Sequence, residues 1–474
     1  MKRPETFSAD YLFLPGFLPE ESACFRLNRN QLLCVFLALT ALTYGLTHWP
    51  QPALFWVNLT VTVFYLAFTI YKVVLIWPVS GNENERQRNS CQNQVALLED
   101  LPVYTILVPL YQEAEMVRET ISALDRLDYP AECLDIKLLL EADDISTIEA
   151  LRKINPGPSY EVMVLPPGLP RTKPRACNEG LKQARGKYLV IYDAEDRPEP
   201  DQLKKAVLAF EEAAPEVACF QARLNFYNAS QNLLTTWFTA EYSTWFDLYL
   251  PGLARLEAPV PLGGTSNHFR MDVLKAIGGW DPFNVAEDCD LGIRLYRRGW
   301  RTRILESTTW EEACSRLSDW WRQRSRWVKG YLQTYLVHLR HPGKLLRELG
   351  WLNTLHFHFT VGGLLFCLLL NPVYWSLTVF WLATRSQWLC SFFPPAVFFL
   401  SGFCLFVGNF VFVYTSALAV FRRGQDRLVF PALFIPVYWL LMSLASWKGF
   451  WQFFFRPFHW EKTTHGLSRE RTSR

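Results

Sequence analysis

Hydrophobic residues gather in two regions of the chain, separated by a longer and more mixed region. Two apolar runs near the start, Gln31 to Trp49 and Ala53 to Trp77, each approach the ~20 residues that a helix needs to cross a bilayer. Three more runs lie in the last third of the chain and cover Leu355 to Ala383, Phe392 to Val420 and Val429 to Phe455. This pattern predicts membrane-spanning helices on both sides of the middle region.

The middle region, from about Leu101 to Arg340, has the pattern of an α/β domain. Short runs rich in β-branched residues alternate there with longer stretches of helical periodicity. The predicted strands are Tyr104 to Val108, Ile136 to Leu140, Tyr160 to Leu165 and Lys187 to Tyr192. The predicted helices include Glu113 to Leu127, Pro200 to Ala213 and Glu287 to Arg298. This alternation favours a mostly parallel, Rossmann-like sheet.

The boundaries of these patterns predict six segments. They are a cytoplasmic N-terminal segment (1–30), two transmembrane helices (31–78), a linker (79–100), the α/β domain with interfacial helices (101–345), C-terminal transmembrane or re-entrant helices (346–455) and a cytoplasmic tail (456–474).

Basic residues flank the last apolar run on both sides. Arg422, Arg423 and Arg427 precede it, and Arg456 and Lys462 are among those that follow it. The positive-inside tendency places both flanks in the cytoplasm, so this run is not expected to be a single crossing. We predict a re-entrant, interfacial or paired segment, with about four to six crossings in all.

Composition narrows the expected partners. Half of the 474 residues are hydrophobic, 20% are charged, and the net charge of +3 is spread along the chain. Without a dense basic block, no nucleic acid partner is expected. The eleven cysteines form no C-x-x-C pair, which favours a reduced, cytoplasmic compartment over a disulfide framework or a zinc site.

Acidic residues follow two of the predicted strands. Asp143 and Asp144 come after the second strand, and Asp193, Glu195 and Asp196 come after the fourth. Ligands of open α/β sheets bind beyond the carboxyl ends of strands, so these side chains are expected to share a pocket. Carboxylates suit a hard divalent cation that bridges to a diphosphate, although ordinary turn and helix-cap roles give the same residue types.

A further acidic pair opens a predicted helix. Asp288, next to Glu287, could accept a proton from an acceptor hydroxyl, or the pair could simply form an acidic first helical turn. Aromatic and basic residues alternate from Ser318 to Tyr335, as in an interfacial helix or a platform for a sugar ring. Leu233 to Leu250 is also rich in aromatic residues, and we expect it at the bilayer surface.

Six short segments of the middle region form an ordered set. They are Val108-Pro109-Leu110-Tyr111-Gln112-Glu113, Asp143-Asp144, Thr172-Lys173-Pro174-Arg175-Ala176-Cys177-Asn178, Asp193-Ala194-Glu195-Asp196, Glu287-Asp288 and Gln323-Arg324-Ser325-Arg326-Trp327. In this order they resemble the processive family 2 glycosyltransferases, which include cellulose, hyaluronan and chitin synthases. The last three segments stand at the D-x-D, T-E-D and Q-(Q/R)-x-R-W positions of that family.

This resemblance implies an α/β GT-A domain between transmembrane segments, a UDP-sugar donor and Mg²⁺ or Mn²⁺. The implied nucleotide-binding residues are Tyr111, Glu113, Asp143, Lys173 and Asp193. The implied metal ligands are Asp193 with Glu195 or Asp196, because an extra acid follows the D-x-D position. Ala286 replaces the Thr of T-E-D.

The resemblance also implies roles on the acceptor side. Asp288 would be the general base of an inverting displacement, and the residues that would meet the diphosphate and the acceptor sugar are Glu287, Gln323, Arg324, Arg326 and Trp327. In the tail, the segment with Trp460, Lys462, Thr463 and Thr464 stands where related synthases carry a gating segment. A polar tail that only ends the helix is the alternative.

The main prediction is a multi-pass protein of the bacterial inner membrane with a cytoplasmic catalytic domain. It would extend a β-linked polysaccharide from a UDP-sugar and pass the product through the bilayer. A non-processive transferase acting on a lipid-linked or short acceptor is the second hypothesis. The third is an inactive component of an envelope export or receptor complex.

Overall fold

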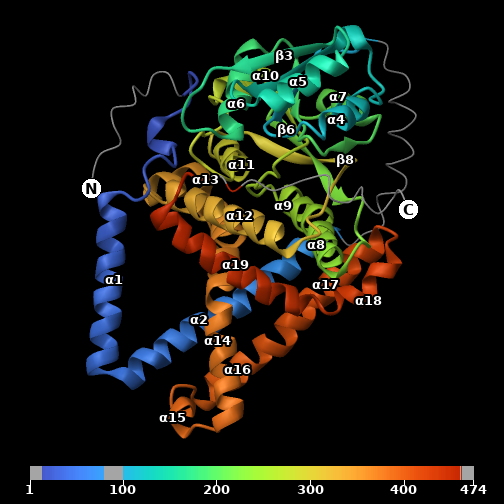
Figure 1. Ribbon diagram of the computed structural model, residues 1–474. Helices are drawn as coiled ribbons and strands as arrows, with labels where there is room; N and C mark the ends of the chain where they lie inside the picture. The colour runs from blue at the N-terminus through green and yellow to red at the C-terminus, as the bar shows by residue number, and fades with distance from the viewer. Residues whose placement is uncertain (1–12, 80–99, 460, 462–474) are drawn as a thin grey trace.

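The computed structural model describes residues 13–79, 100–459 and 461, and shows an α/β domain seated on a group of long helices (Figure 1). The domain is built around one eight-stranded sheet. Its strands are β1 (Tyr104–Leu110), β2 (Leu134–Glu141), β3 (Tyr160–Leu165), β4 (Tyr188–Ile191), β5 (Arg197–Pro198), β6 (Val217–Phe226), β7 (Asn267–Arg270) and β8 (Arg301–Glu311).

The sheet is mixed, which corrects the prediction of a mostly parallel one. Its order is β3-β2-β1-β4-β7-β6-β8-β5. The strands β3, β2, β1 and β4 run parallel, as the alternating pattern predicts. Strand β7 pairs antiparallel with both β4 and β6, and β5 pairs antiparallel with β8. The apolar runs give the first four strands to within a few residues, whereas β5 to β8 lie outside that pattern.

Helices cover both faces of the sheet, because strands buried on both sides need apolar partners on each. The first face packs against α4 (Val117–Leu124), α5 (Ile145–Ile154) and α7 (Gln202–Glu212). The second face packs against α6 (Lys173–Gln183), α10 (Met271–Ala276) and α11 (Glu287–Arg297). The carboxyl ends of β1, β2, β4 and β8 are thereby held in fixed positions.

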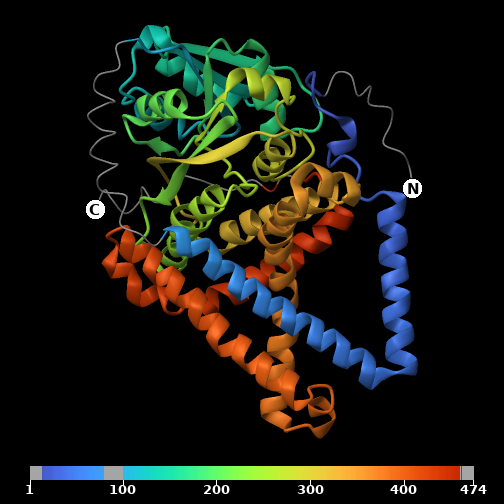
Figure 2. The ribbon, with the colours of Figure 1, turned by 180° about the vertical axis from the view of Figure 1, so that it is seen from behind.

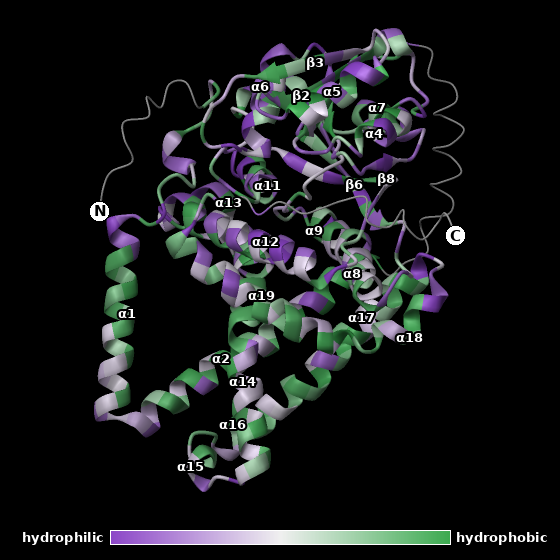
Figure 3. Cartoon of the chain, in the orientation of Figure 1, coloured by the Kyte–Doolittle hydropathy of each residue, from purple (hydrophilic) through white to green (hydrophobic). Residues whose placement is uncertain are grey.

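Apolar helices, most of them long, form the second part of the molecule (Figures 2 and 3). They are α1 (Arg29–His48), α2 (Pro50–Ile76), α13 (Pro342–Phe357), α14 (Leu364–Thr384), α15 (Gln387–Cys390), α16 (Pro395–Phe403), α17 (Asn409–Arg422), α18 (Val429–Ala432) and α19 (Ile435–Phe455). Four stretches of the described residues are long and apolar enough to cross a membrane, namely Arg29–His48, Pro50–Val79, Pro342–Thr384 and Pro395–Arg422.

The last apolar run, which we predict to be re-entrant, interfacial or paired, is bent. Its two parts, Asp426–Ala432 and Ile435–Phe455, meet at 66°, so the segment is either a broken span or a re-entrant loop. If the bent pair is one span, the total is up to five, within the predicted range. Helix α1 has no buried residue and stands apart from the other helices in both views.

Helices α8 (Leu233–Thr244), α9 (Leu250–Arg255) and α12 (Leu317–His338) lie between the sheet and the membrane helices, and a π-helical turn (Trp245–Tyr249) joins α8 to α9. The prediction that Leu233 to Leu250 lies against the bilayer surface is wrong for four of its aromatic side chains, because Trp237, Phe238, Phe246 and Tyr249 are buried. Phe238 and Phe246 are 1% and 3% exposed. They pack inside the protein, where α17 to α19 and the sheet cover them.

Candidate active site

A cavity of about 1880 Å³ begins at the carboxyl ends of the strands and continues between the apolar helices. Most of the residues proposed from the sequence line it. They are Tyr111, Glu113, Lys173, Asp193, Glu195, Glu287, Asp288, Gln323, Arg324, Arg326 and Trp327. Because these side chains come from five segments far apart in the sequence, the fold brings one site together.

Two neighbouring aspartates after β2 have different surroundings. Asp144 caps α5, since its Oδ1 accepts a hydrogen bond from the Thr147 backbone N–H at 3.2 Å, and its Oδ2 accepts another from the Gln112 N–H. Asp143 is about half exposed, and its Oδ2 accepts a hydrogen bond from Arg171 at 2.6 Å. Asp143 is therefore the one available to a ligand.

Arg171 is a site residue that the sequence did not reveal. It lines the cavity, and its Nη1 donates to the Tyr111 hydroxyl at 3.2 Å as well as to Asp143. It thus joins the ends of β1 and β2. A single Arg in the loop before α6 carries no motif, so only the folded loop shows where it points.

The acidic residues after β4 also differ in their surroundings, as Asp143 and Asp144 do. Asp193 and Glu195 line the cavity. Asp196 is 3% exposed, and its Oδ2 accepts hydrogen bonds from the Asp193 N–H at 2.8 Å and from the Thr265 hydroxyl. Asp196 therefore shapes the turn that presents the other two acids. Lys173 pairs with Asp193 and donates to the Gly264 carbonyl at 2.7 Å.

The cavity holds more negative charge than the neighbouring cations neutralise. Burial, together with the charges of Asp193 and Glu113, raises the pKa of Glu195 to about 8. Glu311, at the end of β8, also lines the cavity, and burial raises its pKa well above the usual range, with Asp196 and Glu195 adding to the effect. Its Oε1 is buried with no hydrogen-bond partner among the described residues.

Glu311 is the second residue that the sequence did not reveal. Its position at the end of a strand could have identified it, but β8 was not predicted from the sequence.

Within the described ranges, no group of three or more His, Cys, Asp or Glu side chains is arranged to hold a metal ion. Two carboxylates, Asp193 and Glu195, still face the cavity in surroundings that a divalent cation would neutralise, so the side chains fit such an ion.

Asp288 lies in the first turn of α11 and lines the cavity. Its Oδ1 accepts a hydrogen bond from the Cys289 N–H at 2.7 Å. Burial raises the pKa of Asp288, although that hydrogen bond and the charges of Lys173 and Arg326 oppose the rise. Burial and the Asp288 charge raise the pKa of Glu287 to about 8.

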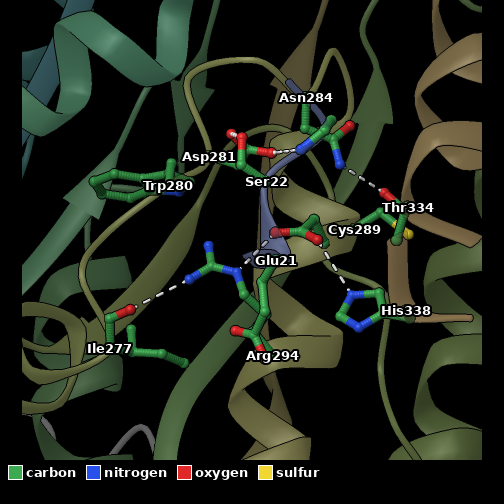
Figure 4. Close-up of polar contacts among 12 residues, drawn as sticks. Glu21, Ser22, Ile277, Trp280, Asp281, Asn284, Cys289, Arg294, Thr334 and His338 are labelled. Carbon is green, nitrogen blue, oxygen red and sulfur yellow. Dashed lines mark hydrogen bonds and ion pairs between the residues drawn. The ribbon is translucent and has the colours of Figure 1, made fainter. Parts of the chain in front are cut away.

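A buried polar cluster fixes the opposite side of α11 (Figure 4). The Asp290 carboxylate accepts a hydrogen bond from Arg294 Nε at 2.7 Å and lies 3.1 Å from His338 Nε2 of α12. The Arg294 guanidinium also donates to the Gly279 carbonyl at 2.7 Å. Asp290, Arg294 and His338 are almost fully buried, so these contacts link α11, α12 and the loop after α10.

The N-terminal segment closes this cluster from outside. The Ser22 hydroxyl donates to Asp281 Oδ1 at 2.8 Å, and the Ala23 N–H donates to Asp281 Oδ2 at 2.6 Å. Asn284, three residues further on, donates through Nδ2 to the Thr334 hydroxyl of α12 at 2.9 Å. The turn that leads into Glu287 and Asp288 is therefore held by the N-terminal segment and by α12.

The residues of the Q-(Q/R)-x-R-W segment on α12 have separate surroundings. Arg324 forms a two-pronged ion pair with Glu241, and its guanidinium lies 4.2 Å from the Phe238 ring centroid and 4.6 Å from that of Trp327. The charge of Arg324 is therefore neutralised by Glu241 within the protein. The Trp327 ring lies nearly parallel to that of Tyr242, with the centroids 6.1 Å apart.

Arg326 faces the acids of the cavity. Burial lowers its pKa, while the charges of Glu287, Asp288 and Asp193 oppose that change. Gln323 also lines the cavity, and its Oε1 accepts a hydrogen bond from the Cys314 thiol at 3.5 Å. The segment thus supplies the Arg326 cation and the Trp327 ring to the cavity.

The chain after α19 returns to this cavity. Lys329 of α12 donates to the His459 carbonyl at 2.7 Å, and Gln333 donates to the Pro457 carbonyl at 3.2 Å. Phe458 and His459 line the cavity. The predicted gating residues Trp460, Lys462, Thr463 and Thr464 lie outside the described residues, but the segment just before them is anchored at the site.

Comparisons with known proteins agree with this geometry. The profile of the family described as glycosyl transferase family group 2 matches residues 188–445, more than half of the chain. The chain is 28% identical over 269 residues to "Probable glycosyltransferase YdaM" of Bacillus subtilis, covering 56% of this chain and 63% of that protein.

The names of two further relatives indicate different kinds of acceptor. One is "Probable glucomannan 4-beta-mannosyltransferase 10" of Arabidopsis thaliana, with 29% identity over 49% of this chain and 43% of the relative. The other is "Beta-monoglucosyldiacylglycerol synthase" of Synechocystis, with 28% identity over 50% of each chain. The chain therefore spans between 43% and 63% of the length of these three relatives.

Proposed function

The chain belongs to glycosyl transferase family group 2, and from this premise we propose that it transfers a sugar, with inversion, from a nucleotide diphosphate sugar to a glycan or lipid acceptor at the membrane. The observation that carries the proposal is that Asp193, Glu195 and Asp288 line the same cavity, which continues between the membrane helices. Donor and acceptor can thus meet at one place while the acceptor stays in the bilayer.

The donor side of the cavity suits a nucleotide. Tyr111 offers an aromatic ring to a base, and Asp143 offers a carboxylate to ribose hydroxyls, with Arg171 between them. Glu113 lines the same end. Lys173, now paired with Asp193, stands where a diphosphate would bring further negative charge. A UDP-sugar, as the resemblance implies, is our proposed donor.

Asp193 and Glu195 would hold Mg²⁺ or Mn²⁺, with Glu311 beside them. When bound, the cation would neutralise charge on the departing diphosphate. Asp196 is not proposed as a ligand, because its Oδ2 accepts two hydrogen bonds within the protein. Arg326, which faces the acids of α11 across the cavity, would contact diphosphate oxygens in the same site.

Asp288 would act as the general base. As the acceptor oxygen attacks the anomeric carbon, the Asp288 carboxylate takes the hydroxyl proton, the new glycosidic bond forms, and the bond from that carbon to the diphosphate oxygen breaks. The anomeric configuration inverts because attack and departure occur on opposite faces. Trp327 would stack on the acceptor sugar, since its ring is part of the cavity wall and is held by Arg324 and Tyr242.

The orientation of the domain follows from its contacts with a basic segment. Arg423, at the end of α17, forms a two-pronged ion pair with Asp247 below the sheet, and Arg422 donates to the Val79 carbonyl at 2.9 Å. The positive-inside tendency puts such residues in the cytoplasm. We therefore propose that the α/β domain is cytoplasmic in a multi-pass membrane protein. Residence in a bacterial inner membrane stays a prediction.

The acceptor has two candidates. A growing β-linked polysaccharide is supported by the continuity of the cavity between the membrane helices and by the likeness to a protein named as a glucomannan mannosyltransferase. A lipid is supported by the likeness to a protein named as a diacylglycerol glycoside synthase and by the apolar walls of the lower cavity. Processive elongation and translocation stay predictions.

The test is transfer of radiolabel from a panel of UDP- and GDP-sugars by membranes that contain the protein, with Mg²⁺, Mn²⁺ or a chelator. We expect metal-dependent transfer from one donor, and separation of the products into polymer, short glycan and lipid extract identifies the acceptor class. Absence of both transfer and donor hydrolysis with every donor would contradict the proposal and favour a non-catalytic component.

A further inference from the structure

The part of the cavity between the membrane helices offers few free hydrogen-bonding groups. Its polar side chains mainly bind each other or helix carbonyls: Tyr65 donates to Asn371 at 2.5 Å, Thr62 and Ser401 are 2.8 Å apart, Tyr374 donates to Asn58 at 3.0 Å, and Thr69 donates to the Tyr65 carbonyl at 2.9 Å. The remaining wall is apolar, including Phe68, Leu364, Leu368, Phe393, Phe398 and Phe412. Such walls suit hydrocarbon better than sugar hydroxyls.

Lys72 marks the boundary between this apolar part and the catalytic part. It lies one turn before the end of α2, lines the cavity and is only 4% exposed. Its ammonium is 4.0 Å from the Tyr249 ring centroid, 5.7 Å from that of Trp245 and 5.2 Å from that of Phe68. Across the described part of the chain, no hydrogen bond or ion pair reaches this ammonium.

Two acids of the elements around the cavity are already engaged. Glu241 of α8 binds Arg324 and accepts a hydrogen bond from Tyr438 at 2.6 Å. Asp247 binds Arg423. An ammonium within a membrane helix is costly without an anion, and cation–π contacts offset only part of that cost. Lys72 is therefore a preformed site for a negative group that enters the cavity.

We propose that the acceptor is an anionic lipid whose phosphate group binds Lys72 while its hydrocarbon chain occupies the apolar part of the cavity. The inference rests on the proposed transferase activity and specifies the acceptor of that site. The acceptor hydroxyl would reach Asp288 in the same cavity. The proton passes to Asp288 and the sugar to the hydroxyl oxygen, so the lipid phosphate is unchanged by the reaction.

Lipid binding can be measured without any turnover. The full-length protein, purified in a neutral detergent, is given phosphatidylglycerol or phosphatidylcholine, and retained lipids are counted by native mass spectrometry. We expect Lys72→Gln to weaken phosphatidylglycerol binding about tenfold, the effect of losing one charged hydrogen bond, and Lys72→Arg to retain it. Lys344→Gln, which removes a partly exposed lysine in the first turn of α13 that pairs with Glu20 and lies outside the cavity wall, is the matched control.

Equal phosphatidylglycerol binding by the wild type and Lys72→Gln would overturn the proposal. So would equal loss in the Lys344→Gln control, because that result would reflect net charge and not the cavity. A general loss of fold in Lys72→Gln is recognised by its thermal unfolding, and in that case the comparison of Lys72→Arg with Lys72→Met decides.

Transfer separates this proposal from the function on which it rests. The assay uses phosphatidylcholine vesicles that also contain either phosphatidylglycerol or diacylglycerol, and it follows nucleotide release and label in the lipid extract. We expect label in the phosphatidylglycerol product, reduced about tenfold by Lys72→Gln, with donor hydrolysis unchanged. Label only in diacylglycerol or only in a water-soluble polymer would overturn the lipid phosphate but uphold the transferase. No nucleotide release from any donor would overturn both.

Discussion

Helix α11 carries two acids, Asp288 and Asp290, whose surroundings are opposite. Asp288 faces the cavity, and burial raises its pKa even though the Cys289 N–H and two cations oppose the rise. Burial acts on Asp290 in the same direction, but Arg294 and His338 outweigh it, so the pKa of Asp290 lies below its ordinary value. A buried carboxylate with full partners holds the fold, and one left facing a cavity is available for chemistry.

The first way to break this comparison is to neutralise the cavity acid. Asp288→Asn should lower the rate of transfer about 10³-fold, because the hydroxyl proton loses its acceptor, while nucleotide binding stays near that of the wild type. Transfer is measured by radiolabel and nucleotide affinity by calorimetry. Asp272→Asn, an exposed aspartate at the start of α10, is the control. Transfer at the wild-type rate in Asp288→Asn would refute its role as the base.

The second change removes the paired acid. Asp290→Ala should lower the free energy of unfolding by about 3–5 kcal/mol, since Arg294 is left buried without its partner. Thermal unfolding of the purified protein measures this loss. Protein that remains folded at low temperature should still bind the donor nucleotide. An unchanged unfolding midpoint would contradict the structural role of the cluster in Figure 4.

The same contrast is testable after β4, where Glu195 lines the cavity and Asp196 is packed inside. Glu195→Gln should raise the Mn²⁺ concentration needed for half-maximal transfer by about tenfold or more, because one proposed ligand is weakened. Asp196→Asn should leave that concentration near the wild-type value and lower the unfolding midpoint. The opposite result would make Asp196 the metal ligand.

Two tryptophans of α12 extend the comparison to aromatic residues. Trp327→Ala should reduce transfer to the acceptor about tenfold more than it reduces donor hydrolysis, because a stacking platform matters only when an acceptor sugar is present. Trp320 is fully buried and donates to the Tyr438 hydroxyl at 3.1 Å, so Trp320→Ala should lower stability instead. Equal losses of transfer and hydrolysis in Trp327→Ala would count against stacking.

The smallest expected effect is that transfer activity and folding stability are lost at different pH values. Asp288 must be ionised to act as a base, so transfer should fall as pH decreases through its raised pKa, above the ordinary value of about 4. The pKa of Asp290 is depressed, so the stability that it contributes is present above its unfolded pKa and lost only as pH falls through the lower folded value. Activity should therefore fall in milder acid than stability does. Coincident losses would contradict this.

The sequence alone predicted the parts of this molecule that local patterns specify. Apolar runs long enough for a bilayer marked α1, α2 and the C-terminal helices, and β-branched runs marked β1 to β4 to within a few residues. Most of the site residues predicted from the ordered acidic and aromatic segments line the cavity, because acids at the ends of strands must lie along one edge of the sheet.

What the sequence could not supply depends on contacts between distant segments. Asp193, Glu195 and Asp196 are three acids close together in the sequence, and the hydrogen bonds from the Asp193 N–H and from Thr265, 69 positions away, hold Asp196 inside the protein. Arg324 matches a phosphate-binding motif but is paired with Glu241 from another helix. Arg171, Glu311 and Lys72 carry no motif at all. Their roles arise from what surrounds them, since burial and neighbouring charges set the behaviour of an ionisable group, and the tertiary fold alone decides those.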